Sequence, residues 1–165
     1  MSDTGFPPSR FVVRPLEDRV VQDHGFPVSS RYTETVILPI LGPSTTLCLR
    51  RLGSWAVAEP RGVTVDTETL AADLGLGHGI GRHSPMGRTL DRLCQFGMGE
   101  WRDGELQVRT AVAPVTERQL ARLSPLVVLA HRSMVRQLRD PQPAPSRSSL
   151  DQGVAARART SGRTR

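Results

Sequence analysis

Apolar residues recur at helical spacing in the part of the chain that we expect to be an ordered domain, residues 34–140. Between residues 44 and 58 they fall on one side of a helix, at Cys48, Leu52, Trp55 and Ala56. We expect Ser44 to cap the start of this helix, and Pro60 and Gly62 to stop it. The alternating segment Val63-Thr64-Val65 that follows is typical of a short β-strand.

Two further helices are predicted around a glycine-rich turn. Asp66 is a suitable N-cap for the first helix, whose apolar positions are Leu70, Ala71 and Leu74. Residues 75–83 lack the spacing of a nucleotide-binding loop and have no βαβ unit around them, so we expect a long turn there. Ser84-Pro85 then begins a helix in the preferred order, and Gly97 is placed to end it. Its inward positions are Met86, Leu90, Leu93 and Cys94.

Residues 98–109 predict a β-hairpin. Asp103-Gly104 between two alternating segments favours a two-residue type I′ turn. This turn pairs Arg102 with Glu105 and Trp101 with Leu106 across the hairpin. The register is consistent, because it places opposite charges and an aromatic–aliphatic pair opposite each other.

The segments before residue 34 and after the hairpin are expected to differ. Thr116 and Gln119 have capping-box spacing, and Ser124-Pro125 begins a last helix that reaches Arg139, with inward positions at Val127, Ala130, Met134 and Leu138. Prolines and glycines divide residues 1–33 into short pieces, so we expect an extended N-terminal arm. Within this arm, Phe11-Val12-Val13 and Val20-Val21 are candidates for short strands or for contacts with the core.

The predicted fold class is mainly α with a small antiparallel sheet. Over residues 42–112, the order of helix, short strand, helix, turn, helix and hairpin resembles the winged helix-turn-helix superfamily. The run Arg88-Thr89-Leu90-Asp91-Arg92-Leu93 leading into Phe96-Gly97 is similar to that of many bacterial regulators of this class. The resemblance implies a winged helix-turn-helix followed by C-terminal helices, with residues 98–109 as the wing. The turn at residues 75–83 is longer than the roughly three or four residues usual for this motif.

The resemblance also implies which residues would contact DNA. In the superfamily the third helix, here residues 84–96, enters the major groove. The DNA-facing residues would then be Arg82, His83, Ser84, Arg88, Arg92 and Gln95, with Arg102 on the wing. Arginine suits this role, because its guanidinium group can bind guanine through two hydrogen bonds and can also neutralise phosphates.

The composition narrows the chemistry that the chain can perform. All 22 basic side chains are arginine, lysine and asparagine are absent, and isoleucine is rare, which is typical of a GC-rich bacterial genome such as an actinobacterial one. Without lysine, neither a P-loop nor a Schiff-base mechanism is available. Cys48 and Cys94 lie in apolar helical patterns and are expected to be buried free thiols. The histidines are scattered, and His78 and His83 come nearest to a ligand pair. We expect no catalytic residues, no metal site and no cofactor.

The net charge of +6 is concentrated near the C-terminus. Residues 141–165 hold five arginines and one aspartate, a balance of +4, whereas residues 1–140 hold 17 arginines and 15 acids, a balance of +2. The tail is rich in proline, serine, alanine and glycine, so we expect it to be disordered. Two roles remain open for it: an inert solubilising segment, or an arginine-rich arm that binds phosphates without sequence preference.

These observations favour a non-enzymatic protein that binds double-stranded DNA, as a transcriptional regulator does. The alternative is a winged-helix module for dimerisation or docking, with residues 36–41 and 126–138 as apolar faces and a second copy of the chain as a partner. The balance of +2 over residues 1–140 is weakly basic for a DNA-binding protein, so a further possibility is that the arginines are simply a solvated helix face. No apolar run approaches the roughly 18 residues of a membrane span, and no secretory signal is recognisable. We therefore expect a cytoplasmic protein, associated with the nucleoid if it binds DNA.

Overall fold

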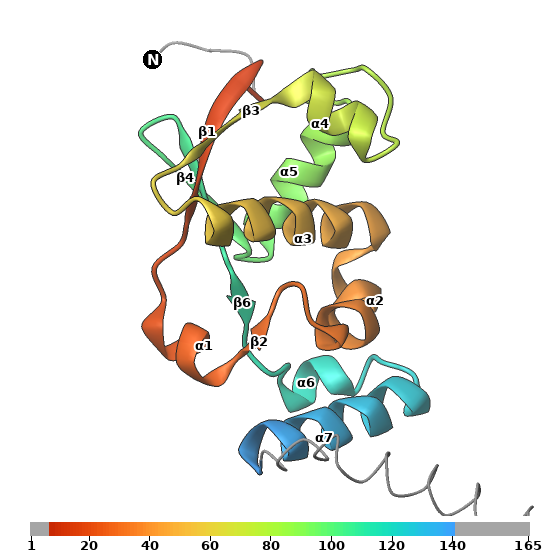
Figure 1. Cartoon of the computed structure of the whole chain (residues 1–165). Helices are drawn as coiled ribbons and strands as arrows, with labels where there is room; N and C mark the ends of the chain where they lie inside the picture. The colour runs from red at the N-terminus through yellow and green to blue at the C-terminus, as the bar shows by residue number, and fades with distance from the viewer. Residues whose placement is uncertain (1–6, 141–165) are drawn as a thin grey trace, which may run out of the picture. The chain divides into compact units, whose positions relative to one another are not determined.

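The computed structural model describes residues 7–140, so the tail predicted over residues 141–165 lies outside the described residues. The chain divides into two units after Val135, and the first unit, over residues 7–135, contains both sheets and the core. The elements, followed in Figure 1, are β1 (Arg10–Pro15), α1 (Arg19–His24), β2 (Phe26–Pro27), the π-helix η1 (Thr33–Ile37), α2 (Leu38–Leu41), α3 (Pro43–Ala58), β3 (Val63–Asp66), α4 (Thr67–Asp73), α5 (Pro85–Gln95), β4 (Gly99–Arg102), β5 (Glu105–Val108), β6 (Ala111–Val112), α6 (Glu117–Leu120) and α7 (Pro125–Arg139).

The main sheet is mixed, with the strand order β3-β1-β5-β4. Strand β1 is antiparallel to β3 and parallel to β5, and β4 and β5 form the antiparallel hairpin. The prediction of a small antiparallel sheet is therefore wrong for this sheet, because it did not include β1. A separate antiparallel pair is formed by β2 and β6.

The segment predicted as an extended N-terminal arm contributes an inner strand and a helix. In β1, Phe11 and Val13 alternate with less buried residues and are 3% and 0% exposed, which is the pattern of a strand with one buried face. Val20 and Val21 lie in α1, which Asp18 caps by accepting a hydrogen bond from the backbone N–H of Val21 at 3.2 Å. The described part of residues 1–33 is thus integrated into the fold.

The hairpin of β4 and β5 has the predicted turn and register. Asp103 and Gly104 have φ values of +50° and +80°, as a type I′ turn requires of both central residues. Arg102 lies opposite Glu105 and Trp101 opposite Leu106. The turn residues alone specify this register, because the connection is only two residues long.

The predicted helix caps are confirmed for α4, α5 and α6, whereas the start of α3 differs. Asp66 and Ser84 accept hydrogen bonds from the first turns of α4 and α5, and Thr116 forms a capping box with Gln119. Helix α3 begins at Pro43 with Gly42 as its N-cap, so the prediction of Ser44 as the cap is wrong. Proline is well suited to the first helical position, because an N–H at that position would have no acceptor within the helix.

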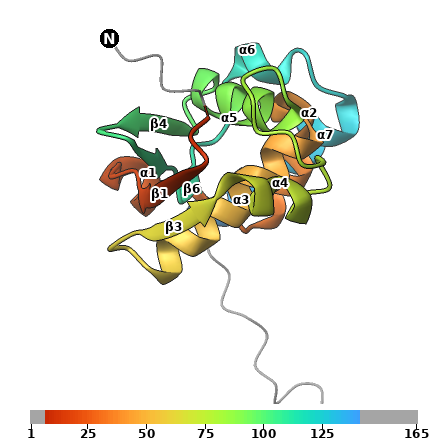
Figure 2. The same cartoon turned by 90° about the horizontal axis from the view of Figure 1, so that it is seen from above.

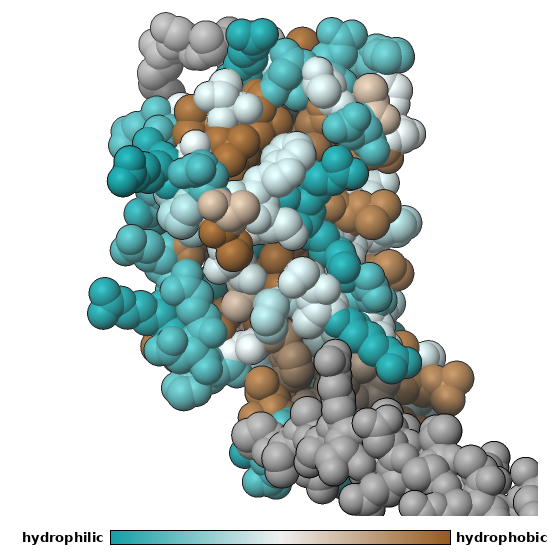
Figure 3. Space-filling view, in the orientation of Figure 1, coloured by the Kyte–Doolittle hydropathy of each residue, from teal (hydrophilic) through white to brown (hydrophobic). Residues whose placement is uncertain are grey.

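Helices α3, α4 and α5 lie on one side of the main sheet, as Figure 2 shows from above. The core between α3, α5 and β5 consists of side chains with 0% exposure, among them Leu49, Leu52, Met86, Leu90, Leu93, Leu106 and Val108. The exposed apolar residues are dispersed. Figure 3 shows hydrophobic side chains on one face in separate groups with hydrophilic ones between them. Within residues 7–140, no helix combines the length and the apolar character that crossing a bilayer requires.

The two apolar segments proposed as docking faces have different environments. In residues 36–41, the side chains of Val36, Ile37 and Leu41 are at most 3% exposed, so this segment belongs to the core. In α7, by contrast, Leu126 and Leu129 are 79% and 62% exposed. The first face keeps one such side chain at the surface, Leu38 at 37% exposure, so the larger exposed apolar surface is on α7.

Candidate nucleic-acid interface

Helix α5 has a fully buried face and a polar outer face. Met86, Leu90 and Leu93 have no exposed surface, and they fix the helix against the core. The hydroxyl of Ser84 accepts a hydrogen bond from the N–H of Gly87 at 3.0 Å, which sets where the helix begins. The opposite face is left to Arg88, Arg92 and Gln95, because helical spacing separates these positions from the buried ones.

The residues predicted to contact DNA lie at the surface, at two places in the fold. Ser84 is half-buried, and the others are exposed: Arg82, His83, Arg88, Arg92, Gln95 and Arg102. At the N-terminal end of α5, Arg88 folds back and donates a hydrogen bond of 2.8 Å from Nη1 to the carbonyl of His83. The structure therefore brings Arg82, His83, Ser84 and Arg88 together around the start of this helix, whereas Arg102 lies on the hairpin.

Arg92 forms hydrogen bonds to the backbone at the end of α2. Its Nε and Nη2 donate hydrogen bonds to the carbonyl oxygens of Leu41 and Ile40, at 2.6 and 3.1 Å. Its guanidinium carbon also lies 4.8 Å from the centre of the Phe96 ring. These carbonyls belong to the end of α2, whose last backbone acceptors lack helical partners. Arg92 therefore links α2 to α5, and sequence spacing gave no sign of this role.

Arg102 on the hairpin pairs with a different acid from the one expected. Its Nη2 lies 2.9 Å from Oε2 of Glu100, two residues earlier on the same side of β4. Glu105, although opposite Arg102, instead accepts hydrogen bonds of 2.6 and 3.2 Å from Arg14. The expected Arg102–Glu105 contact is absent because β1 lies on the other side of β5 and brings Arg14 to Glu105. Hydrogen bonding to Arg102 lowers the pKa of Glu100, so this pair stays charged at neutral pH.

Within the described part of the chain, the arginines near α5 lack the carboxylate partner that Arg102 has on the hairpin. Among the ion pairs within residues 7–140, none includes Arg82, Arg88 or Arg92. The half-buried Asp91 is the acid nearest in sequence to the latter two arginines. A positively charged surface whose arginines have no paired carboxylate is available to an external anion such as a phosphate.

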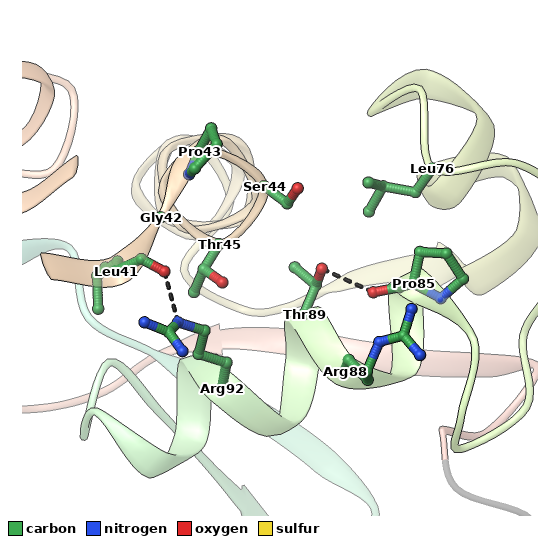
Figure 4. A pocket seen from close by; sticks show the side chains of 10 residues that line it. All are labelled: Leu41, Gly42, Pro43, Ser44, Thr45, Leu76, Pro85, Arg88, Thr89 and Arg92. Carbon is green, nitrogen blue, oxygen red and sulfur yellow. Dashed lines mark hydrogen bonds between the residues drawn. The ribbon is translucent and has the colours of Figure 1, made fainter. Parts of the chain in front are cut away.

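A cavity of about 290 Å³ opens between the first turn of α3 and the outer face of α5 (Figure 4). Arg88, Thr89 and Arg92 line it from α5, and Gly42, Pro43, Ser44 and Thr45 line it from the start of α3. The sequence predicted the arginines but not the residues of α3. Gly42-Pro43 directly before an apolar helical pattern was the available signal, because it indicates a helix start without a capping side chain.

The cysteines and histidines predicted as free thiols and as the nearest approach to a ligand pair lie as follows. Burial raises the pKa of Cys48 to about 12 and that of Cys94 to about 11, so both thiols are protonated at neutral pH. Nowhere in residues 7–140 do three His, Cys, Asp or Glu side chains gather as ligands for a metal ion. His78 approaches Glu68 at 3.7 Å, from Nδ1 to Oε1.

The α5 surface therefore combines exposed arginines, a capped helix start and an adjoining cavity. In comparisons with known proteins, the chain matches no protein-family model, no curated protein and no solved structure.

Proposed function

We propose that the chain is a non-enzymatic DNA-binding protein of winged-helix type that acts as a transcriptional regulator, with α5 in the major groove. The observation that carries this proposal is the outer face of α5. Its arginines are exposed, no carboxylate pairs with them in the described residues, and a fully buried row of side chains holds the helix in place. A helix that contacts base edges needs rigid support from the core and donor side chains at the surface.

The element order supports the winged-helix assignment. Helices α3, α4 and α5 correspond to the three helices of the motif, β3 to its first strand, and the hairpin of β4 and β5 to its wing. The main departure is β1, which lies between β3 and β5 in the sheet. This departure leaves the outer face of α5 uncovered, so it does not conflict with the proposed docking.

The residues would have different tasks on DNA. Arg82, His83 and Arg88, at the start of α5, have the reach and the donors for base edges and for the nearest phosphates. Gln95 lies near the other end of α5, at a position where it would meet the DNA backbone. Arg92 already donates to two carbonyl groups, and Arg102 is paired with Glu100, so we expect smaller direct contributions from both.

Binding of fluorescent duplex DNA by the full-length chain tests this proposal. We expect Arg88→Ala to weaken binding about tenfold and to reduce the slope of log K against log salt by about 0.9, the value for one lost phosphate contact. Arg61→Ala is the matched control, because Arg61 is also exposed but lies on the turn before β3. Equal losses in both variants, or no binding by the unaltered chain at low salt, would contradict the proposal.

Selection of bound fragments from random DNA then tests the regulatory part of the proposal. A shared motif among the selected fragments is expected of a sequence-specific regulator, and an inverted repeat would show that it binds as a dimer. Fragments without a shared motif would instead indicate binding to the DNA backbone alone.

A docking module is the second candidate function, and one observation favours it. Leu126 and Leu129 are neighbours on one side of α7 and are the two most exposed large apolar side chains of that helix. A homodimer through this side of α7 would be disrupted by Leu129→Asp. Sedimentation of the unaltered chain and of this variant decides the point, since a monomer in both cases would exclude dimerisation through α7.

A further inference from the structure

Helix α3 begins without any side chain to satisfy its first backbone N–H groups. Its N-cap, Gly42, has φ +83° and ψ 159°, a conformation that is essentially restricted to glycine, so a capping side chain is excluded there. The first intrahelical hydrogen bond runs from the N–H of Thr46 to the carbonyl of Gly42 at 3.0 Å. The N–H groups of Ser44 and Thr45 consequently have no acceptor within the helix, and both residues line the cavity beside α5.

The hydroxyl of Thr45 is a second, independent donor group that faces this cavity. Thr45 is only 3% exposed, it lines the cavity, and its hydroxyl has no hydrogen-bond partner among the described residues. The neighbouring hydroxyls are paired, since Thr46 donates to Gly42 and Thr89 to Pro85, both at 2.8 Å. Figure 4 shows the Thr45 hydroxyl on the side of its helix that faces Thr89 and Arg92. Thr45 Oγ1 is not among the fully buried unpartnered atoms of the described residues, so it is open to the cavity and can donate to an acceptor bound there.

The charges around the cavity define which acceptor would fit. Arg88 and Arg92 line one wall, and the positive end of the 16-residue helix α3 forms another. Among residues 7–140, no aspartate or glutamate lines the cavity. Arg92 is held by the carbonyl groups of Leu41 and Ile40, whereas Arg88 makes one hydrogen bond, to His83. An anion with several acceptor oxygens can accept from the start of α3 and from Arg88 at once.

We propose that this cavity binds a phosphate group. The N–H groups of Ser44 and Thr45 and the Thr45 hydroxyl donate to its oxygens, and Arg88 supplies the opposing charge. The phosphate takes the place of the missing cap of α3, and Arg92 positions that helix start through Leu41. About 290 Å³ also leaves room for part of the group to which the phosphate is attached, and Leu76 and Pro85 give that part of the wall an apolar surface.

Two sources can supply a group of this kind. One is the backbone of the DNA that α5 contacts, in which case the inference rests on the proposed function and gives it an anchoring phosphate. The other is a free phosphate-bearing small molecule, which requires no DNA binding at all. The test therefore has one arm for each source.

The experiment is a pair of NMR titrations of the full-length ¹⁵N-labelled chain. One uses inorganic phosphate with chloride at the same ionic strength as its reference, and the other uses a short DNA duplex. We expect saturable shifts of the Ser44 and Thr45 amide signals in at least one arm. Thr45→Val should weaken that binding about tenfold, the loss of one hydrogen bond to a charged group. Thr46→Val is the matched control and should leave the affinity unchanged, because its hydroxyl is already used within the helix.

The outcomes separate this inference from the proposed function. Shifts with phosphate, together with no sign of DNA binding anywhere on the chain, support the cavity as a phosphate site and overturn the DNA-binding proposal. Shifts with DNA that Thr45→Val weakens support both. DNA binding that leaves the Ser44 and Thr45 signals unmoved, with no shifts in the phosphate arm, overturns the cavity site alone. Absence of shifts in both arms, or equal effects of Thr45→Val and Thr46→Val, also overturns the phosphate site.

Discussion

The hydroxyl of Tyr32, the residue directly before η1, lies 2.8 Å from Nδ1 of His131 on α7. Both side chains are buried. The N–H of Val115 donates to the same hydroxyl at 2.9 Å. We assign the phenol as the donor to Nδ1, because its oxygen already accepts from Val115. Nδ1 is then unprotonated, and the contact requires a neutral imidazole.

Stability is therefore expected to fall in mild acid. Burial lowers the pKa of His131 below its ordinary value of 6.5, with Glu117 opposing this shift and Arg132 adding to it. The unfolded chain thus binds the proton more tightly than the folded one, so the free energy of unfolding is highest above pH 6.5 and decreases as the pH falls below that value. Urea unfolding at a series of pH values measures this decrease. In His131→Gln the slope over this pH interval should be smaller, and an unchanged slope would show that another group is responsible.

The two arginines on the outer face of α5 are expected to differ in their effect on stability. Arg92→Ala removes two hydrogen bonds to the end of α2 and should lower the free energy of unfolding by about 1–2 kcal/mol. Arg88→Ala removes one exposed hydrogen bond and should change it by less than about 0.5 kcal/mol. Thermal or urea unfolding of the two variants checks this difference. Similar stability of both would mean that the link from Arg92 to Leu41 contributes nothing.

Gly87 is expected to be intolerant of a methyl group. A Cβ there would lie 2.5 Å from the carbonyl oxygen of Gly81 and 2.7 Å from that of Arg82, and both are backbone atoms of the turn before α5. Gly87→Ala must displace this turn and should cost about 1–3 kcal/mol of stability. Gly81→Ala is the matched control, because a Cβ at that position has open space around it. Comparable destabilisation by the two substitutions would show that the turn is not held closely against α5.

Both cysteines should be unreactive in the folded protein. With pKa values raised to about 12 for Cys48 and about 11 for Cys94, almost no thiolate exists near neutral pH. A chromogenic disulfide reagent should therefore label neither residue until the chain is unfolded in guanidinium chloride. Fast labelling of Cys94 in the native state would mean that its helix opens locally, and Cys94→Ser would identify the site.

The local elements of this fold could be predicted from the sequence because their signals are local. Asp66 and Ser84 cap the helices that they were expected to cap, and Asp103-Gly104 sets the hairpin register. Each of these signals depends on residues within one turn of helix or a two-residue connection. The outer face of α5 follows in the same way, from the spacing of apolar residues within a single helix.

The contacts that the sequence did not indicate join residues far apart in the chain. Strand β1 pairs with β5, and Arg14 reaches Glu105 across 91 positions. The hydrogen bond from Arg92 to Leu41 spans 51 positions. The periodicity of one segment contains no information about which distant segment supplies its partner. For this reason the arginines of the candidate site could be identified, but not the α3 residues that complete the cavity.

The place of β1 in the sheet has a consequence for how the molecule can be divided. A fragment beginning at residue 34 would contain every element that resembles a winged helix, yet β3 and β5 would each lose the strand between them. Two rows of backbone groups would then face solvent, and such edges promote aggregation. On the ribosome the same dependence delays closure of the sheet, since β1 has to wait for residues 105–108 before its second edge is covered.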